Sequence, residues 1–309
     1  MTDQTVTIDA LLPPAMASKA EDLGVKKAAL PFMNMFMLAI LAGAFIGIGA
    51  IFATTVSAGG ISVRDATGAA AFATSLPYGV IRLLTGLVFT TGLILVVVGG
   101  AELFTGNNLI SMAFASGKVT VQGLLGNWVV VYLGNFVGSI LTAYLVFLGK
   151  QYTFGGGAIG LTILNIGEAK TSFTFIQAVA LGIMCNALVC MAVWLCYSAR
   201  STTDKILSII PPIACFVAAG FEHSIANMYF IPMALLVKYS GNAAFFETIA
   251  RTPADFANLT WGNFFIKNLL PVTIGNIIGG AVMVGLVYWF VYLRKPATTK
   301  AATGAAAKV

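Results

Sequence analysis

Five long apolar runs constrain the fold of this chain more than any other feature. Each is close to or longer than the roughly 20 residues that an α-helix needs to cross a bilayer. They lie at about 31–57, 77–101, 122–149, 173–198 and 264–293. A sixth run, at about 205–239, is long enough but carries Glu222 and His223 in its middle. With 59% hydrophobic and 9% charged residues, the sequence predicts an all-α membrane protein with six transmembrane helices rather than a soluble domain.

The distribution of charge predicts how the chain lies in the membrane. The polar stretch of about 30 residues before the first span does not resemble the short basic start of a cleavable signal peptide, so we expect that span to be retained. Six spans place both termini on one side, and ten of the 17 lysines and arginines then share that side. This excess favours cytoplasmic termini, and the net charge of +6 needs no nucleic-acid partner.

The segment before the first span predicts a short amphipathic helix on the cytoplasmic side of the bilayer. It opens on two prolines and then places one residue per turn on a common face: Met16, Ala20, Leu23 and Lys27. We expect three regions, namely this helix within residues 1–30, a six-span channel domain at 31–293 and a disordered cytoplasmic tail at 294–309. The glycine-rich stretch at 152–160 is expected to be a flexible connector, because no strand precedes it and no Lys-Ser/Thr pair follows.

Two motifs occur twice, in the same order. "GGAELFTGN" at 99–107 returns as "AGFEHSIAN" at 219–227, and "GNFVG" at 134–138 returns as "GNIIG" at 275–279. The ordered repeat predicts two homologous halves of three spans each, and because three is odd the second half is inverted in the membrane. The shared positions are Gly100, Glu102 and Asn107 in one half and Gly220, Glu222 and Asn227 in the other.

The repeated motif predicts that spans two and five are broken helices. Residues from Gly106 to Ala115 have the length of a half-helix, and irregular backbone at membrane depth is tolerated only inside protein or against a water-filled cavity. Paired breaks near the midplane point to a permeation site, where half-helix N-termini attract anions.

Each buried carboxylate needs a partner, since a charged side chain at the bilayer centre costs about 2.5–3.5 kcal/mol on insertion scales. We expect Glu102 and Glu222 to accept hydrogen bonds from backbone N–H groups freed at their own breaks; direct contact with a permeant is the alternative. The amides expected to tie the broken helices together are those of Asn107, Asn227, Asn135 and Asn276.

His223 is the only histidine and sits at the second predicted break. It is either a satisfied core residue or a proton donor or gate, since its ordinary pKa lies near neutrality. Thr105, at the other break, is a hydroxyl partner across the pore or a cap for the helix from Gly106. The bulky neighbours that either face lipid and core or narrow the pore are Phe89, Leu93, Leu103, Phe104, Val189 and Phe216.

No motif favours catalysis. The four cysteines lack metal-ligand spacing, and the chain has neither a nucleophile motif nor a cofactor fingerprint. We therefore expect no enzyme activity, no cofactor and no metal. An intramembrane enzyme built on the two glutamates and the histidine remains an alternative. So does an anion-sensing or scaffold protein whose N-terminal helix reports on a cytoplasmic enzyme.

Four motifs together resemble the formate/nitrite transporter family. They are "VVGGAELFTG" (97–106), "GIMCNALVCMA" (182–192), "GFEHSIANM" (220–228) and "PVTIGNIIGG" (271–280). The similarity extends from about residue 10 to 294, and "EHSIANMYFIPM" with "NLLPVTIGNIIGG" looks most like the formate channels of the family. The resemblance implies a homopentamer of aquaporin-like protomers, each with its own pore, in the inner membrane of a bacterial cell.

The resemblance also implies roles for single residues. His223 matches the central pore histidine of the family, Thr105 the threonine that faces it, and Asn186 the asparagine near that histidine. The six bulky residues named above match its apolar constrictions. Lys170 and Lys27 match basic residues linked to anion attraction and, for the N-terminal helix, to pH-dependent behaviour.

The function implied is passage of formate and other small monocarboxylate or inorganic anions. A bare carboxylate in an apolar slit loses many kcal/mol of solvation, whereas protonating it costs about 1.4 kcal/mol per pH unit above its pKa. We expect His223, oriented by Asn186 and Glu222, to lend or relay the proton while Thr105 holds an oxygen of the anion. Nitrite or hydrosulfide as the main substrate of the same kind of channel is the alternative.

Overall fold

The computed structural model describes residues 9–59, 63–64, 67, 69–72 and 76–294. Apart from one antiparallel pair of short strands, β1 (Val63–Arg64) and β2 (Ala70–Phe72), the described chain is helical. The first half contains α1 (Pro13–Ala28), α2 (Phe32–Ala58), α3 (Tyr78–Gly99), α4 (Phe104–Asn107), α5 (Ile110–Ala115) and α6 (Val121–Leu148). The second contains η1 (Gln151–Thr153), α7 (Ala158–Thr171), α8 (Phe175–Ser198), α9 (Thr202–Ala219), α10 (Ser224–Ser240), α11 (Ala243–Thr248), η2 (Pro253–Asp255) and the helical stretch Trp261–Tyr292.

Six helices are long and apolar enough to cross a membrane, as predicted: α2, α3, α6, α8, α9 and the stretch Trp261–Tyr292. That last stretch is built from α12 (Trp261–Asn263), η3 (Phe264–Leu269), α13 (Leu270–Ile277), η4 (Ile278–Leu286) and α14 (Val287–Tyr292). Its η3 and η4 segments are π-helical. The predicted run at 205–239 is α9 followed by α10, so the fifth span is indeed broken.

Both predicted breaks begin at a glycine. Gly100 ends α3 with φ +79°, and Gly220 ends α9 with φ +80°, a left-handed conformation that a residue without Cβ adopts at little cost. The chain then runs extended before α4 and α10 begin. The half-helix expected from Gly106 to Ala115 is instead two short helices, α4 and α5. Thr105 therefore lies inside α4 and does not cap a helix beginning at Gly106.

Each half has a helix that precedes its three spans. In the second half this is α7, which the sequence analysis missed: the glycines at 155–157 are a connector, but the helix begins at Ala158. At 14 residues α7 is too short to span a bilayer, so it gave no signal of length. Its counterpart in the first half is α1, as the ion pairs below establish.

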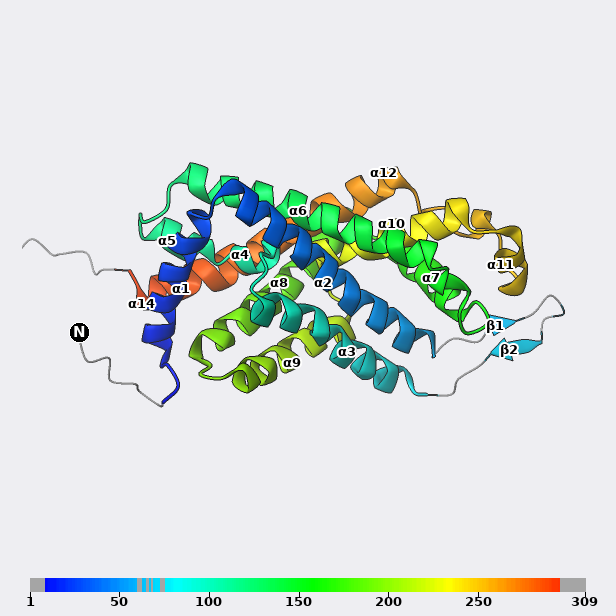
Figure 1. Cartoon of the computed structure of the whole chain (residues 1–309), viewed down its shortest axis with the longest axis horizontal. Helices are drawn as coiled ribbons and strands as arrows, with labels where there is room; N and C mark the ends of the chain where they lie inside the picture. The colour runs from blue at the N-terminus through cyan, green and yellow to red at the C-terminus, as the bar shows by residue number, and fades with distance from the viewer. Residues whose placement is uncertain (1–8, 60–62, 65–66, 68, 73–75, 295–309) are drawn as a thin grey trace, which may run out of the picture.

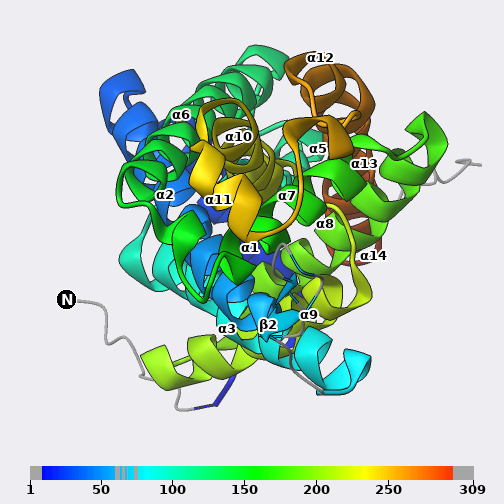
Figure 2. The same cartoon turned by 90° about the vertical axis from the view of Figure 1, so that its right-hand side faces the viewer.

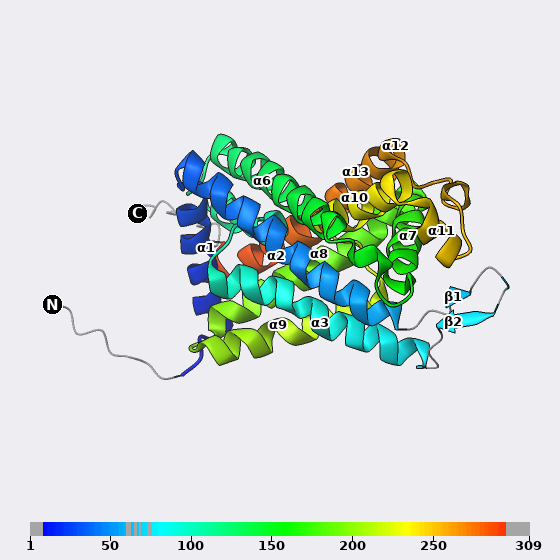
Figure 3. The same ribbon diagram turned by 45° about the vertical axis from the view of Figure 1, so that its right-hand side comes forward.

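The helix α1 lies across one end of the bundle, beside α14, whereas β1, β2 and α11 lie at the other end (Figures 1 and 3). Figure 2 views the spans nearly end-on. Met16 and Ala20 on the predicted apolar face are buried against Met112 of α5 and Trp194 of α8. The amphipathic face of α1 thus packs on the protein itself. The expected disordered tail, except Arg294, lies outside the described residues.

The repeated Gly-Asn-x-x-Gly motif lets helices approach closely. A Cβ on Gly138 of α6 would collide with the carbonyl oxygen of Ile40 in α2, and one on Gly279 of η4 with that of Ile183 in α8. Small residues at such crossings are typical of membrane helix pairs. The same contact in both halves agrees with the predicted inverted repeat.

Candidate permeation site

A buried network holds the first break. The Glu102 carboxylate, 5% exposed, accepts from Lys27 Nζ at 2.6 Å and from Asn107 Nδ2 at 2.7 Å. Asn107 also donates to Asn127 Oδ1 at 2.9 Å, and Asn127 Nδ2 donates back to the carbonyl of Lys27 at 3.0 Å. The network therefore joins α1, the break and α6.

The second break has the same network. The Glu222 carboxylate, 2% exposed, accepts from Lys170 Nζ at 2.6 Å and Asn227 Nδ2 at 2.7 Å. Asn227 donates to Asn268 Oδ1 at 2.7 Å, and Asn268 Nδ2 donates to the carbonyl of Lys170 at 2.9 Å. Lys27 of α1 and Lys170 of α7 hold equivalent positions, so α1 and α7 are equivalent elements.

The glutamates therefore have partners other than those expected. Each carboxylate is compensated by a lysine and by amides, which is what a buried charge requires, and not by backbone N–H groups of its own break. Those N–H groups are taken by asparagines: Phe104 N donates to Asn135 Oδ1, and Ser224 N to Asn276 Oδ1, both at 2.9 Å. These two hydrogen bonds join the first residues of α4 and α10 to the spans that carry Asn135 and Asn276.

His223 and Thr105 meet where the two breaks face one another. Thr105 Oγ1 lies 3.0 Å from His223 Nε2, and both residues are buried. His223 is also the N-cap of α10, because its Nδ1 accepts the N–H of Ala226 at 3.0 Å. An Nδ1 that accepts carries no proton, so the neutral ring has its proton on Nε2 and donates it to Thr105. The ring of Phe216 stacks on the imidazole at 5.8 Å.

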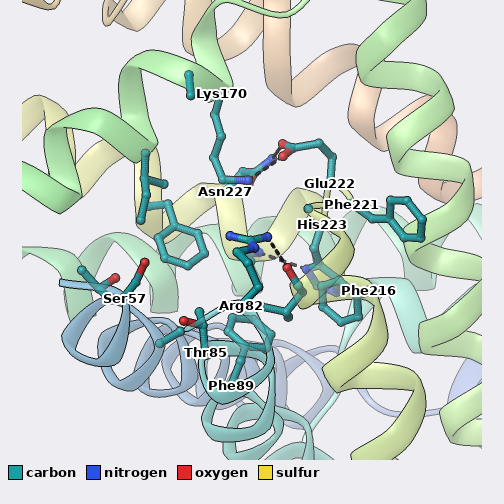
Figure 4. Close-up of a pocket in the computed structure, with 18 residues that line it drawn as sticks. Ser57, Arg82, Thr85, Phe89, Lys170, Phe216, Phe221, Glu222, His223 and Asn227 are labelled. Carbon is teal, nitrogen blue, oxygen red and sulfur yellow. Dashed lines mark hydrogen bonds and ion pairs between the residues drawn. The ribbon is translucent and has the colours of Figure 1, made fainter. Parts of the chain in front are cut away.

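Two cavities lie near this pair, and each is lined by residues from both halves. One, here called the Lys170 cavity, is lined by Phe89, Phe216, Glu222 and His223 besides Lys170 (Figure 4). The other, the Lys27 cavity, is lined by Leu93, Leu103, Glu102 and Gly106 besides Lys27. Four of the six predicted constriction residues therefore line the cavities, two on each side.

Both cavities carry an excess of positive charge that the sequence analysis did not assign to the site. Arg82 joins Lys170 in one cavity, whereas Lys19 and Lys205 join Lys27 in the other. In the sequence these cations looked like ordinary positive charges at span ends. Burial lowers the pKa of Lys19, and the nearby charges of Arg200 and Lys205 lower it further.

Three of the predicted pore residues that line neither cavity have other contacts: Phe104, Val189 and Asn186. Phe104 packs edge-on against Tyr132 of α6, with ring centroids 4.9 Å apart, and Val189 is buried in the core. Asn186 donates to the carbonyl of Thr105 at 3.3 Å and to that of Asn276 at 2.7 Å. Neither Asn186 nor Glu222 is hydrogen-bonded to the imidazole within the described residues. The expectation that they orient it directly is wrong, because the Ala226 N–H and the Thr105 hydroxyl do so.

Inverted halves, paired broken helices, and two cationic cavities separated by apolar side chains and one histidine define a membrane transport protein of the channel type. The sequence profile of the formate/nitrite transporter family matches residues 14–290. The chain belongs to this family.

Known relatives are similar in sequence over nearly the whole chain. The formate channel FocA of Escherichia coli strain K12 is 46% identical over 93% of this chain and 96% of its own. FocA of Haemophilus influenzae is 40% identical over 92% and 95%. A solved structure described as a pentameric formate channel with formate bound superposes with a TM-score of 0.77 at 46% identity, covering 85% of this chain and 98% of that one.

Proposed function

We propose that this protein is a homopentameric channel that lets formate and other small monovalent anions cross the membrane, each protomer through its own pore. The observation that carries the proposal is the His223–Thr105 pair, which offers hydrogen-bond donors between two cationic cavities. The similarity to channels named for formate supports the choice of substrate.

The mechanism follows from the solvation of the permeant. Cations in either cavity attract the anion, but the apolar side chains Phe89, Phe216, Leu93 and Leu103 replace its water shell. The Nε2–H of His223 and the hydroxyl of Thr105 then take over as donors to the anion's oxygens. Neutralising the anion with a proton removes most of the remaining solvation cost.

The N-cap limits how His223 handles a proton. A neutral ring with its proton on Nε2 is a hydrogen-bond donor, and only the doubly protonated, cationic ring can give a proton away and become neutral. Protonating Nδ1 ends the hydrogen bond from Ala226 N–H. Lending a proton to formate is therefore coupled to loosening of the first turn of α10.

A proteoliposome flux assay between pH 5 and pH 8 tests the substrate and the coupling. Formate is expected to move faster than chloride, and faster as the pH falls. Higher rates for nitrite or hydrosulfide than for formate would favour the alternative substrates. A formate rate no greater than that of chloride would remove the proposal.

We further propose that both termini face the cytoplasm of a bacterial cell, which places the Lys27 cavity on the cytoplasmic side, with α1 in its wall. Reporter fusions to the C-terminus would test this orientation.

On the cytoplasmic side, α1 is the element that a formate-producing enzyme would contact. Loss of co-purification with such an enzyme after exchanging the exposed residues of α1 is the test of that partner.

A further inference from the structure

Arg82 is the first residue in a row of side chains on α3 that extends toward His223. Arg82, Thr85 and Phe89 lie at helical spacing on one face of α3, and all three line the Lys170 cavity (Figure 4). Phe89 in turn packs edge-on against Phe216, the ring that stacks on His223. The first two residues of this row, Arg82 and Thr85, are polar, and the permeation mechanism above gives neither of them a direct contact with the anion.

Arg82 neutralises the end of a broken helix. Its Nε donates to the carbonyl of Ala218 at 3.0 Å and its Nη2 donates to the carbonyl of Val217, in the last turn of α9 before Gly220. The C-terminal carbonyls of a helix carry partial negative charge, which would repel an anion in this cavity. The guanidinium covers them and turns that part of the wall positive.

Arg82 is also the cation of this cavity without a carboxylate. Lys170 is paired with Glu222, whereas the hydrogen bonds of Arg82 within the described part of the chain go only to carbonyls. A guanidinium has five N–H donors, so three remain after these two bonds. Planar carboxylates are the ligands that such donors bind best.

Thr85 supplies a second donor one turn further in. Its residue is 6% exposed and its hydroxyl has no hydrogen-bond partner among the described residues. A buried hydroxyl without a partner costs free energy, which a ligand oxygen would recover.

We propose that Arg82 and Thr85 form an anion-binding station in the Lys170 cavity, which takes a small carboxylate or inorganic monovalent anion before it reaches Phe89, Phe216 and His223. The guanidinium binds the anion's oxygens and the Thr85 hydroxyl donates to one of them. This inference rests on the proposed function, because it assigns the station to the same permeating anion.

The test compares formate uptake over a range of formate concentrations in proteoliposomes containing the full chain. Arg82→Gln is expected to raise the half-saturating concentration roughly five- to tenfold, and Thr85→Val roughly two- to threefold, with a smaller change in maximal rate. Arg82→Lys keeps the charge but loses the planar fork, so it should raise the half-saturating concentration less than Arg82→Gln does. Raising the ionic strength should shrink the Arg82→Gln difference. The matched control is Lys150→Gln, an exposed cation outside the cavity, which should leave the half-saturating concentration unchanged.

An unchanged half-saturating concentration in Arg82→Gln, with only a lower thermal stability, would mean that Arg82 merely caps α9 and would overturn the inference. Saturation-transfer NMR with ¹³C-formate on the solubilised protein separates the two proposals. Formate binding that Arg82→Gln abolishes, in a wild-type protein that shows no flux, would keep the station and remove the channel. Equal binding in both proteins would overturn the station.

Discussion

His223 occupies one of the positions of the repeated motif where the halves differ in chemistry. Glu102 and Glu222 have equivalent partners, but the residue after each glutamate is Leu103 in one half and His223 in the other. Leu103 lines the Lys27 cavity as an apolar side chain, whereas His223 caps α10 and meets Thr105. The equivalent glutamates stabilise the two breaks, whereas His223, which has no equivalent in the first half, supplies the hydrogen-bond donor.

Two substitutions separate the cap from the permeation role of His223. His223→Asn keeps an N-cap side chain for Ala226 N–H but loses the Nε2–H, so we expect normal thermal stability and formate flux reduced roughly ten- to a hundredfold. His223→Phe loses both and should also lower stability by about 1 kcal/mol. Flux that keeps its wild-type rate and pH dependence in His223→Phe would contradict the role of the histidine.

The glutamates are expected to matter for stability more than for selectivity. Glu222→Gln keeps hydrogen bonds to the amides but leaves the Lys170 ammonium, 16% exposed, without its counter-charge. Breaking a buried pair in this way typically costs about 3–5 kcal/mol. Thermal denaturation should show a large loss, with a somewhat smaller one for Glu102→Gln, whose partner Lys27 is 29% exposed. Equal stability of both variants and wild type would contradict the scaffold role.

The helix breaks at Gly100 and Gly220 place Thr105 and His223 next to each other. Both Gly100 and Gly220 have positive φ, so alanine at either position should cost about 1–3 kcal/mol in backbone strain. They differ in surroundings: a Cβ at Gly100 meets open space, whereas one at Gly220 comes within 3.4 Å of Arg82 Nη2. We therefore expect Gly220→Ala also to raise the half-saturating formate concentration, and Gly100→Ala to leave it unchanged. Kinetics altered equally by both would show that strain alone is responsible.

The element α1 is held by a contact that responds to alkaline pH. Glu21 of α1 pairs with Lys118 in the loop after α5, and its hydrogen bond raises the pKa of Lys118. A raised pKa in the folded state means that the contact stabilises α1 below the ordinary lysine range and is lost above it. After correction for the intrinsic base-catalysed rate, hydrogen exchange in α1, but not in α7, should accelerate at high pH and in Glu21→Gln. The same exchange rate for α1 in Glu21→Gln and wild type would contradict this docking role.

At the scale of the whole molecule, each protomer contains both cavities and the His223–Thr105 pair, so a pore needs no residue from a second chain. Oligomers mixed from wild-type and His223→Phe chains should pass formate in proportion to the wild-type fraction. Native mass spectrometry of the wild-type protein is expected to show five copies. A steep, non-linear loss of flux on mixing would indicate a pore shared between chains.

The features that could be predicted from the sequence are those that depend on residues close together in the chain. Span length and apolarity are properties of neighbouring residues, so the spans were predicted within a few residues of their observed ends. The glycines and asparagines of the repeated motifs indicated the breaks and their ties for the same reason. The short helix α7 was not predicted, because a stretch of 14 residues that contains Glu168 and Lys170 resembles a polar connector.

The sequence by itself determined the six spans, the inverted repeat and the two breaks, and it left Thr105 as either a partner of His223 or a helix cap. Only the tertiary structure decided that Lys27 and Lys170 compensate the glutamates, that Ala226 sets the tautomer of His223, and that Arg82 and Thr85 reach the cavity. The physical reason is separation along the chain. Charge compensation across 75 residues, as between Lys27 and Glu102, depends on how the helices pack and leaves no periodic mark in the sequence.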